Sequence, residues 1–266
     1  MKIYIVTDLE GVSGVVTRDQ VFPGNAGYEK ARDWLTADVN AAVQGAVEGG
    51  ATEVIVLDGH GANSAVNIRY ENIHPKAQLI QGSPWRDYLE MLDGSFAGLF
   101  QVGAHAMSGT AKAVLEHTMS SADWVEMTLN GIPTGEIGLC AAIAGHHGVP
   151  FVMVSGDDKA AAESRKLSPE VEAAVVKQAI SRGCALLQPR QAADDIIGQC
   201  AKRAIGKVKS IRPIEVETPV SVEVEYLRND AAERIIEREG VTKLTTRRVR
   251  YTGADLVEAV RRWRGG

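Results

Sequence analysis

The sequence predicts an α/β fold, a three-layer α/β/α arrangement around a mostly parallel sheet, with a C-terminal α+β portion packed against it. Two observations support this prediction. Apolar strand segments alternate with helical patterns over residues 1–210, and the strands of residues 211–266 instead alternate apolar with polar side chains. We therefore expect one α/β domain with an inserted hairpin over residues 1–210. Residues 211–266 are expected to form an α+β segment that does not fold independently.

The first elements form a predicted βαβ unit. Residues 3–6 make an apolar strand, residues 28–48 carry a helical stripe that stops at two glycines, and residues 53–57 are typical of a buried parallel strand. Parallel strands share their carboxyl ends. Asp8, after the first strand, and His60, after the second, are therefore expected at the same edge of the sheet.

Two further apolar runs predict additional strands of this sheet. Residues 97–103 place His105 just beyond their end, and residues 150–155 are followed by Gly156-Asp157-Asp158. Strand ends and loops are where α/β proteins carry their chemistry. These polar residues are therefore candidates for a site.

A hairpin followed by a helix is predicted between these two strands. Asn130-Gly131, flanked by residues 124–128 and Ile132, is a strong hairpin signal. An alanine-rich helix follows, with Thr134 as its expected N-cap. This places Glu136 in the first turn, where the helix dipole favours an anion.

The C-terminal segment contains two predicted strands and two helices. Residues 214–226 alternate apolar with polar, and Pro219 favours an edge position or a bulge in that strand. A short helix over residues 231–238, a strand over 241–251 and a helix over 255–263 complete the chain.

Composition excludes several classes of function. A net charge of −5 without a basic stripe argues against nucleic-acid binding. No stretch approaches the roughly 20 apolar residues of a membrane span, and Asp8 and Glu10 interrupt the apolar N-terminus, so a cytoplasmic protein is expected. The basic residues near the C-terminus are interpreted as solvated faces or subunit contacts. They are Arg247, Arg248, Arg250, Arg261, Arg262 and Arg264.

The cysteines give no sign of a disulfide framework or a thiolate zinc site. Cys140, Cys184 and Cys200 are odd in number and widely spaced, so we interpret them as small buried residues. A metal in this chain would be held by carboxylates and imidazoles, and zinc is the default ion when two histidines contribute.

Five side chains suited to metal binding follow strand ends or begin a helix: Asp8, Glu10, His60, His105 and Glu136. Two carboxylates on one side of an extended segment repel each other unless a cation or a shared proton lies between them. The five groups suffice for a two-metal site in which one carboxylate bridges the ions and a shared water is ionised to hydroxide. Asp8, the first to leave its strand, is the expected bridge. Such a centre suits amide hydrolysis.

His117 is left outside this ligand set. As a free imidazole it could shuttle a proton to the leaving amine or stabilise a tetrahedral oxyanion.

These residues resemble the zinc-dependent D-aminopeptidases of the bacterial dipeptide-transport-operon type. The resemblance covers most of the chain and rests on several motifs in one order. They are Asp8-Leu-Glu10-Gly11, Asp58-Gly-His60, Gly103-Ala-His105, His117, Gly135-Glu136-Ile-Gly138 and Val154-Ser-Gly-Asp157-Asp158. One departure is that the family often has a serine two residues before the bridging aspartate, where this chain has Val6 with Thr7 adjacent.

The resemblance implies a dinuclear zinc aminopeptidase acting on short peptides with an N-terminal D-residue. It implies one zinc ion held by Asp8, Glu10 and His105 and a second held by Asp8, His60 and Glu136, with His117 as the catalytic residue. A metal-bridging hydroxide is then a sufficient nucleophile, so we expect His117 to assist it. The resemblance also implies a homo-oligomer, a decamer of two stacked pentameric rings with the active sites facing an inner chamber.

Two other functions remain open at this point. The opening through Asp8 and Glu10 also looks like that of haloacid-dehalogenase-type phosphatases, in which Asp8 would be the nucleophile and Gly156-Asp157-Asp158 would hold Mg²⁺. Against this, Glu10 replaces the second aspartate and the histidines would have no role. A non-catalytic binding protein is the third hypothesis, and it does not explain why five ligand-type side chains follow strand ends.

Overall fold

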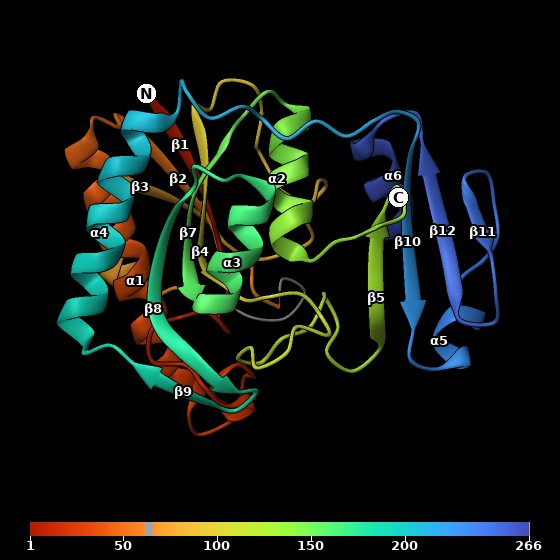
Figure 1. Ribbon diagram of the computed structural model, residues 1–266, viewed down its shortest axis with the longest axis horizontal. Coiled ribbons are helices and arrows are strands. Elements are labelled where there is room, and N and C mark those ends of the chain that lie inside the picture. The colour runs from red at the N-terminus through yellow and green to blue at the C-terminus, as the bar shows by residue number, and fades with distance from the viewer. Residues whose placement is uncertain (62–65, 266) are drawn as a thin grey trace.

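The computed structural model describes residues 1–61 and 66–265, and its centre is a seven-stranded, mostly parallel sheet (Figure 1). All neighbouring strands are parallel except the last pair. In spatial order the strands are β3 (Ala77–Ile80), β2 (Glu53–Leu57), β1 (Lys2–Thr7), β4 (Gly98–Ala104), β7 (Phe151–Asp157), β8 (Glu172–Ser181) and β9 (Cys184–Leu187). The order reverses at β1, which lies between β2 and β4. In open α/β sheets such a reversal opens a crevice at the carboxyl ends of the strands.

Helices cover both faces of this sheet, which confirms the predicted three layers. Helices α1 (Tyr28–Gly49) and α4 (Arg190–Lys207) pack together on one face, and α2 (Glu136–His146) and α3 (Asp158–Leu167) lie on the other (Figure 1). Apolar side chains fill both interfaces, and β1 contributes fully buried residues to each. No helix in residues 1–61 and 66–265 is long and apolar enough to cross a membrane.

A second sheet of five antiparallel strands lies at the right of Figure 1. Its order is β11 (Val241–Lys243), β12 (Arg248–Gly253), β10 (Val220–Tyr226), β5 (Trp124–Leu129) and β6 (Ile132–Pro133). The predicted inserted hairpin, β5 and β6, therefore joins the C-terminal strands. Helix α6 (Leu256–Arg264) packs against β10, β12 and α2, so the second sheet is joined to the main body through α2.

Several local predictions in this region are wrong in detail. The single strand expected over residues 241–251 is two strands, because the Thr245 hydroxyl accepts from the amides of Arg247 and Arg248 and closes a turn between them. Strand β10 is central in its sheet, and Pro219 precedes it, so the proline does not mark an edge. Short helix α5 (Asn229–Glu233) begins two residues earlier than expected and ends sooner.

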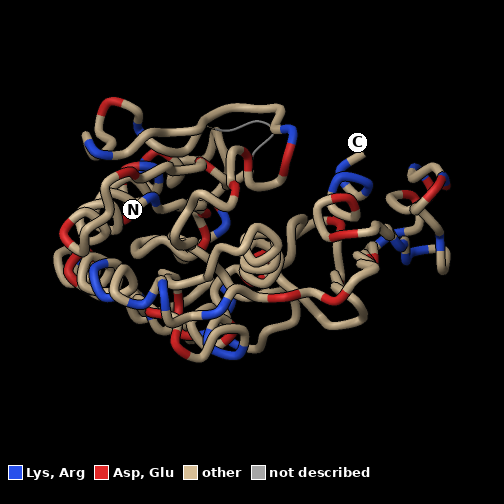
Figure 2. Tube along the Cα trace, turned by 90° about the horizontal axis from the view of Figure 1, so that it is seen from above, with Lys and Arg blue, Asp and Glu red and all other residues tan. Residues whose placement is uncertain are grey.

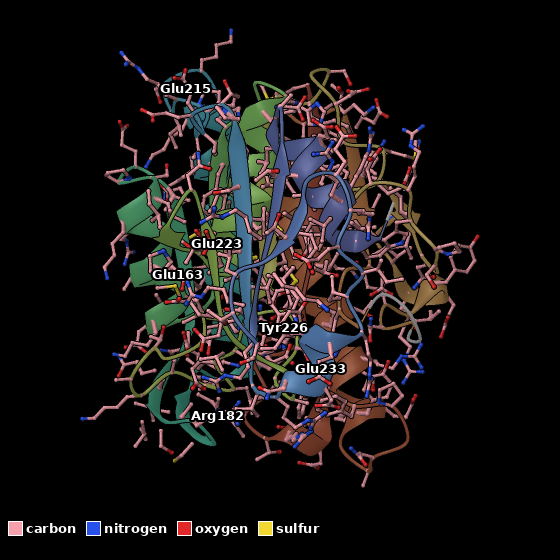
Figure 3. All side chains as sticks on the ribbon, turned by 90° about the vertical axis from the view of Figure 1, so that its right-hand side faces the viewer. Glu163, Arg182, Glu215, Glu223, Tyr226 and Glu233 are labelled. Atoms are coloured by element: carbon pink, nitrogen blue, oxygen red, sulfur yellow. The ribbon has the colours of Figure 1, made fainter. Side chains whose placement is uncertain are left out.

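The basic residues near the C-terminus are largely compensated by carboxylates. Arg248 pairs with Glu126, Glu223 and Glu225, and Arg250 pairs with Glu223. Glu223, labelled in Figure 3, lies on β10 in the second sheet. In the view of Figure 2, Lys and Arg residues are interspersed with Asp and Glu residues along the described part of the chain. This agrees with solvated faces and not with a phosphate-binding stripe.

Candidate metal centre

The centre is built where the chain leaves β1, between the ends of β2 and β4. The amide of Asp8 still donates to the Val102 carbonyl of β4, and the amide of Gly11 donates to the Gly103 carbonyl at 2.7 Å. A Cβ on Gly11 would overlap the backbone of Gly103 and the carbonyl oxygen of Ala104, which explains why a glycine directly follows Glu10. This close contact holds the two carboxylates against the end of β4.

The structure brings together the five side chains that the sequence predicts as metal ligands and His117. His60, after β2, places Nδ1 at 2.9 Å from Asp8 Oδ1 and 3.2 Å from Glu10 Oε2. His105, after β4, places Nε2 at 3.1 Å from Asp8 Oδ2 and 3.3 Å from Glu136 Oε1. The two oxygens of Asp8 thus face different histidines.

Glu136 and His117 complete the cluster from other elements. Glu136 begins α2, and its Oε1 also accepts from the Met119 amide at 2.8 Å. The predicted N-cap, Thr134, is wrong: Gly135 occupies that position and no side chain caps the helix. His117 Nε2 lies 3.9 Å from Glu136 Oε1, and its ring stacks on that of His105.

Each of the three histidines has one ring nitrogen held by a backbone carbonyl. His60 Nε2 donates to Val21, His105 Nδ1 to Ala106 and His117 Nδ1 to Leu115, at 2.8, 3.0 and 2.9 Å. These bonds fix the proton on one nitrogen, so the other nitrogen faces the centre and can bind a metal or exchange a proton.

The carboxylates of the centre favour positive charge on the groups beside them. Burial by itself would lower the pKa of His60, but Glu10 and Asp8 raise that pKa well above its ordinary value. Burial likewise opposes the charged form of His105, yet Glu136 and Asp8 raise its pKa well above the ordinary value. In the opposite sense, the histidines hold the pKa of Asp8 well below its usual range, although burial would raise it. The carboxylates thus favour the positively charged forms of both histidines.

The donor set fits metal ions placed where these protons would be. Glu10 Oε2 and His105 Nε2 are buried atoms without a hydrogen-bond partner among the described residues, although oppositely charged groups lie near them. Asp8, Glu10 and His60 form one group whose ligand atoms lie within 4.8 Å of one another, and His105, His117 and Glu136 form a second. Carboxylate oxygens with imidazole nitrogens are a set that zinc accepts.

A cavity of about 320 Å³ opens over the centre. Its lining includes the aromatic and apolar side chains of Trp85, Tyr88, Met119 and Ile137, together with Phe22 and serines from the segment after His117. Arg18 is the only lysine or arginine among the described lining residues. A small molecule with apolar and charged parts would fit this lining.

Several residues singled out in the sequence lie outside the centre. Asp58 does not bond the His60 ring, because its carboxylate accepts from Asn67, Ile68 and Gln81 and organises the chain after β2. The Thr7 hydroxyl donates to the Leu57 carbonyl and accepts from the Gly59 amide, so it ties β1 to β2.

Asp157, which the phosphatase hypothesis needs for Mg²⁺, forms hydrogen bonds that do not involve the centre. Its carboxylate caps α3 by accepting from the amides of Lys159 and Ala160, and it also accepts from Val114. It does not line the cavity.

The cysteines are free thiols, but one of them differs from its prediction. Cys140 and Cys200 are buried, whereas Cys184 is exposed at the start of edge strand β9. Cys140 lines the cavity. Burial, with the charges of Glu136 and Asp8, raises the pKa of this thiol well above its ordinary value. It is therefore present as the neutral thiol.

Sequence reasoning missed two buried charges that hold the segment after β1. Asp38, on α1, accepts from both the amide and the hydroxyl of Ser13. Lys177, on β8, donates to carbonyls of the same segment. An isolated lysine in a strand gives no sequence signal of burial, because lysines are usually exposed.

Comparisons with known proteins indicate the family of the chain. A family model described as D-aminopeptidase matches residues 1–264. A curated D-aminopeptidase of Bacillus subtilis is 33% identical over 262 residues, which cover 97% of this chain and 94% of that protein. A solved structure, the Zn-dependent D-aminopeptidase DppA from Bacillus subtilis, described as a self-compartmentalizing protease, superposes with a TM-score of 0.92. That match has 32% identity and covers 97% of this chain and 94% of the other.

Proposed function

The chain belongs to the D-aminopeptidase family of peptidases, and from this we propose that it is a dinuclear zinc enzyme that removes an N-terminal D-amino acid from short peptides. The observation that carries the proposal is the position of Asp8. Its two carboxylate oxygens face His60 and His105 separately, so this one side chain can serve both ions. The zinc dependence of the similar Bacillus enzyme supports the choice of metal.

Five residues are proposed as ligands: Asp8, Glu10, His60, His105 and Glu136. The distances favour Asp8, Glu10 and His60 around one ion, and Asp8, His105 and Glu136 around the other. The family resemblance exchanges the two histidines between the ions. Both divisions use the same five residues and leave Asp8 as the bridge.

The chemistry that a pair of zinc ions supplies is polarisation of the peptide carbonyl and ionisation of water at neutral pH. His117 is proposed as the residue that acts on the substrate itself. Its Nδ1 is committed to the Leu115 carbonyl, so only Nε2 is available, and His117 lines the cavity. At this position Nε2 can donate a proton to the leaving amine or a hydrogen bond to the oxyanion.

The segment that carries His117 is held at both ends. The Leu115 amide donates to the Arg182 carbonyl in the turn between β8 and β9, and the Met119 amide donates to Glu136. Leu115 and Met119 have φ values of 51° and 60°, in the left-handed region that residues other than glycine rarely adopt. The surrounding contacts therefore fix an unusual backbone at the proposed catalytic histidine.

Arg18 is proposed to bind the substrate carboxylate. Its guanidinium is exposed at the cavity, lies 5.0 Å from the centre of the Phe22 ring, and forms no ion pair with the carboxylates that the structure describes. A dipeptide or tripeptide has a free carboxylate within a few residues of its amino end. An arginine at the rim can therefore recognise a short peptide by its charge.

The assembly and the cellular location are proposed from similarity. The similar Bacillus enzyme is described as self-compartmentalizing, which supports a homo-oligomer with sequestered active sites. We propose a decamer of two stacked pentameric rings in the cytoplasm, as the resemblance of the sequence implies. An inner chamber of this kind would restrict access to short peptides.

The deciding experiment combines elemental analysis with peptide assays. Purified protein should contain about two zinc ions per chain and should hydrolyse D-Ala peptides faster than L-Ala peptides. Faster hydrolysis of the L-peptides would reject the proposed stereochemistry. A zinc-loaded protein that cleaves neither peptide would reject the peptidase, and release of phosphate from a phosphomonoester would revive the phosphatase hypothesis, which the comparisons do not support.

A further inference from the structure

Lys177 is a buried lysine whose ammonium group is bound by backbone carbonyls. It lies on β8, its residue is 1% exposed, and none of the carboxylates in residues 1–61 and 66–265 forms an ion pair with it. Its ammonium donates three hydrogen bonds, to the carbonyl oxygens of Glu10, Val12 and Val15, at 2.6, 2.9 and 2.6 Å. Removing an ammonium from water is costly unless its hydrogen bonds are replaced, and here all three N–H groups have an acceptor.

The three carbonyls belong to one segment, residues 8–16, which we call the ligand loop. It follows β1 and carries Asp8 and Glu10. These residues form neither helix nor strand, so their carbonyls have no regular hydrogen-bond ladder. Lys177 donates to these carbonyls from β8, which is separated from β1 by β4 and β7.

The Glu10 carboxylate makes few contacts with the described residues that would fix its orientation. Its Oε2 is buried and lacks a hydrogen-bond partner among the described residues, and its nearest charged neighbour is His60, itself a proposed ligand. The orientation of this side chain therefore depends on its backbone. The Glu10 carbonyl is fixed by Lys177, and the next amide, that of Gly11, is fixed by the Gly103 carbonyl.

We propose that Lys177 is a positioning residue of the zinc centre. By binding three carbonyls of the ligand loop, it holds the Glu10 carboxylate where a zinc ion can bind it. This inference rests on the proposed function, because it takes Glu10 as a ligand. Lys177 does not line the cavity and all its N–H groups are used, so it does not touch the substrate.

The test measures zinc affinity of the metal-free protein by competition with a chromophoric chelator, and uses Lys177→Met, which keeps a long side chain and removes every donor. The weaker of the two zinc affinities should fall about 10- to 100-fold, as expected when a residue that orients a ligand is lost.

Two control variants accompany Lys177→Met. Lys159→Met makes the same substitution at a lysine paired with Asp158 near the surface. Val224→Ala destabilises the core of the second sheet, away from the ligand loop.

The control variants separate positioning from general stability. Val224→Ala should lower the melting temperature and leave both zinc affinities unchanged, and a parallel loss of zinc affinity in that variant would mean that stability alone explains the Lys177 effect. Lys177→Gln, which retains two N–H donors on a shorter chain, should fall between the wild type and Lys177→Met. This second variant decides the matter if Lys177→Met does not fold.

The outcomes are distinct. Wild-type zinc affinities in either folded Lys177 variant would overturn this inference and leave the proposed function intact. A wild-type protein that binds no zinc would overturn the proposed function itself. A 10- to 100-fold weaker affinity for one ion in Lys177→Met, with wild-type affinities in both controls, would support the positioning role.

Discussion

The imidazole rings of His105 and His117 are stacked, with centroids 4.1 Å apart and planes 11° from parallel. Both rings face Glu136, but the nearest nitrogen of His105 lies 3.3 Å from its Oε1 and that of His117 lies 3.9 Å away. Distance alone therefore separates the two histidines only weakly. Substitution distinguishes their proposed roles, metal ligand for His105 and catalytic residue for His117.

We expect His117→Ala to keep both zinc ions and to lose about 10² to 10⁴ in kcat, the usual value of acid-base or oxyanion assistance. Elemental analysis and turnover of the same preparation provide the measurement. His74→Ala, at a partly exposed histidine bonded to Gln44, is the matched control and should retain normal turnover. A missing zinc ion in His117→Ala would make His117 a ligand, and normal turnover would make it a bystander.

The metal-free protein should be most stable at mildly acidic pH. Raised pKa values of His60 and His105 add stability below their usual value of 6.5, and this is lost as the pH rises through the raised values. Lowered pKa values of Asp8 and Glu136 add stability above their usual values of 3.8 and 4.5, and this is lost as the pH falls through the lowered values. The stable window thus lies between these limits.

Zinc should remove the loss of stability at higher pH, because it takes the place of the protons on the histidines. The gain in melting temperature on adding zinc to chelator-treated protein should increase between about pH 5 and pH 8. The same scan on His74→Ala controls for a histidine outside the centre. A gain that does not depend on pH would contradict the proton-for-metal exchange.

The arrangement of the site could be predicted from the sequence because it follows from parallel strands. Asp8, His60 and His105 each come just after an apolar run, and adjacent parallel strands end at one edge of the sheet. Glu136 could be placed by the helix that it begins. Which of the proposed ligands would share a zinc ion could not be derived in this way, because it depends on how each side chain is rotated.

Other features depend on long-range contacts that leave no local pattern. The hairpin strand β5 pairs with β10, and Val222 lies opposite Leu129, although 93 positions separate them in the numbering. Helices α1 and α4 approach closely because Gly45 has no Cβ to meet the Gly198 carbonyl. Strand β8 interrupts its apolar residues with Lys177, whose burial becomes favourable only once the ligand loop supplies three carbonyls.

The C-terminal segment should not fold alone. In the intact chain β10 lies between β12 and β5, so a fragment of residues 211–266 would leave one edge of β10 unpaired. It would also expose the apolar residues that α6 buries against α2. We expect the isolated fragment to show little regular structure by circular dichroism. A cooperative thermal transition in this fragment, like that of the full chain, would show that it is an independent domain.

Arg18→Gln should weaken binding of peptides that end in a free carboxylate. The exposed ion pair proposed here is worth at most about 1 kcal/mol, so KM for a D-Ala dipeptide should rise about 5-fold while kcat changes little. The corresponding dipeptide amide is the internal control, since it lacks the charge, and its KM should be equal in the two proteins. An equal rise for both substrates would assign Arg18 to the shape of the cavity and not to carboxylate recognition.

Asp8→Asn tests the bridge on which the dinuclear proposal depends. The substitution keeps the size of the side chain but replaces one anionic oxygen with an amide nitrogen that carries protons and cannot bind a cation. Because Asp8 Oδ1 faces His60 and Oδ2 faces His105, either orientation of the amide removes a ligand from one ion and negative charge from both. Both zinc ions should therefore be lost together, and turnover should be lost with them.

Asp33→Asn, at a surface aspartate paired with Arg69, is the matched control and should keep two ions. Retention of one tightly bound ion in Asp8→Asn would show that the sites are independent, and a phosphorylated Asp8 in the wild type would identify a phosphatase.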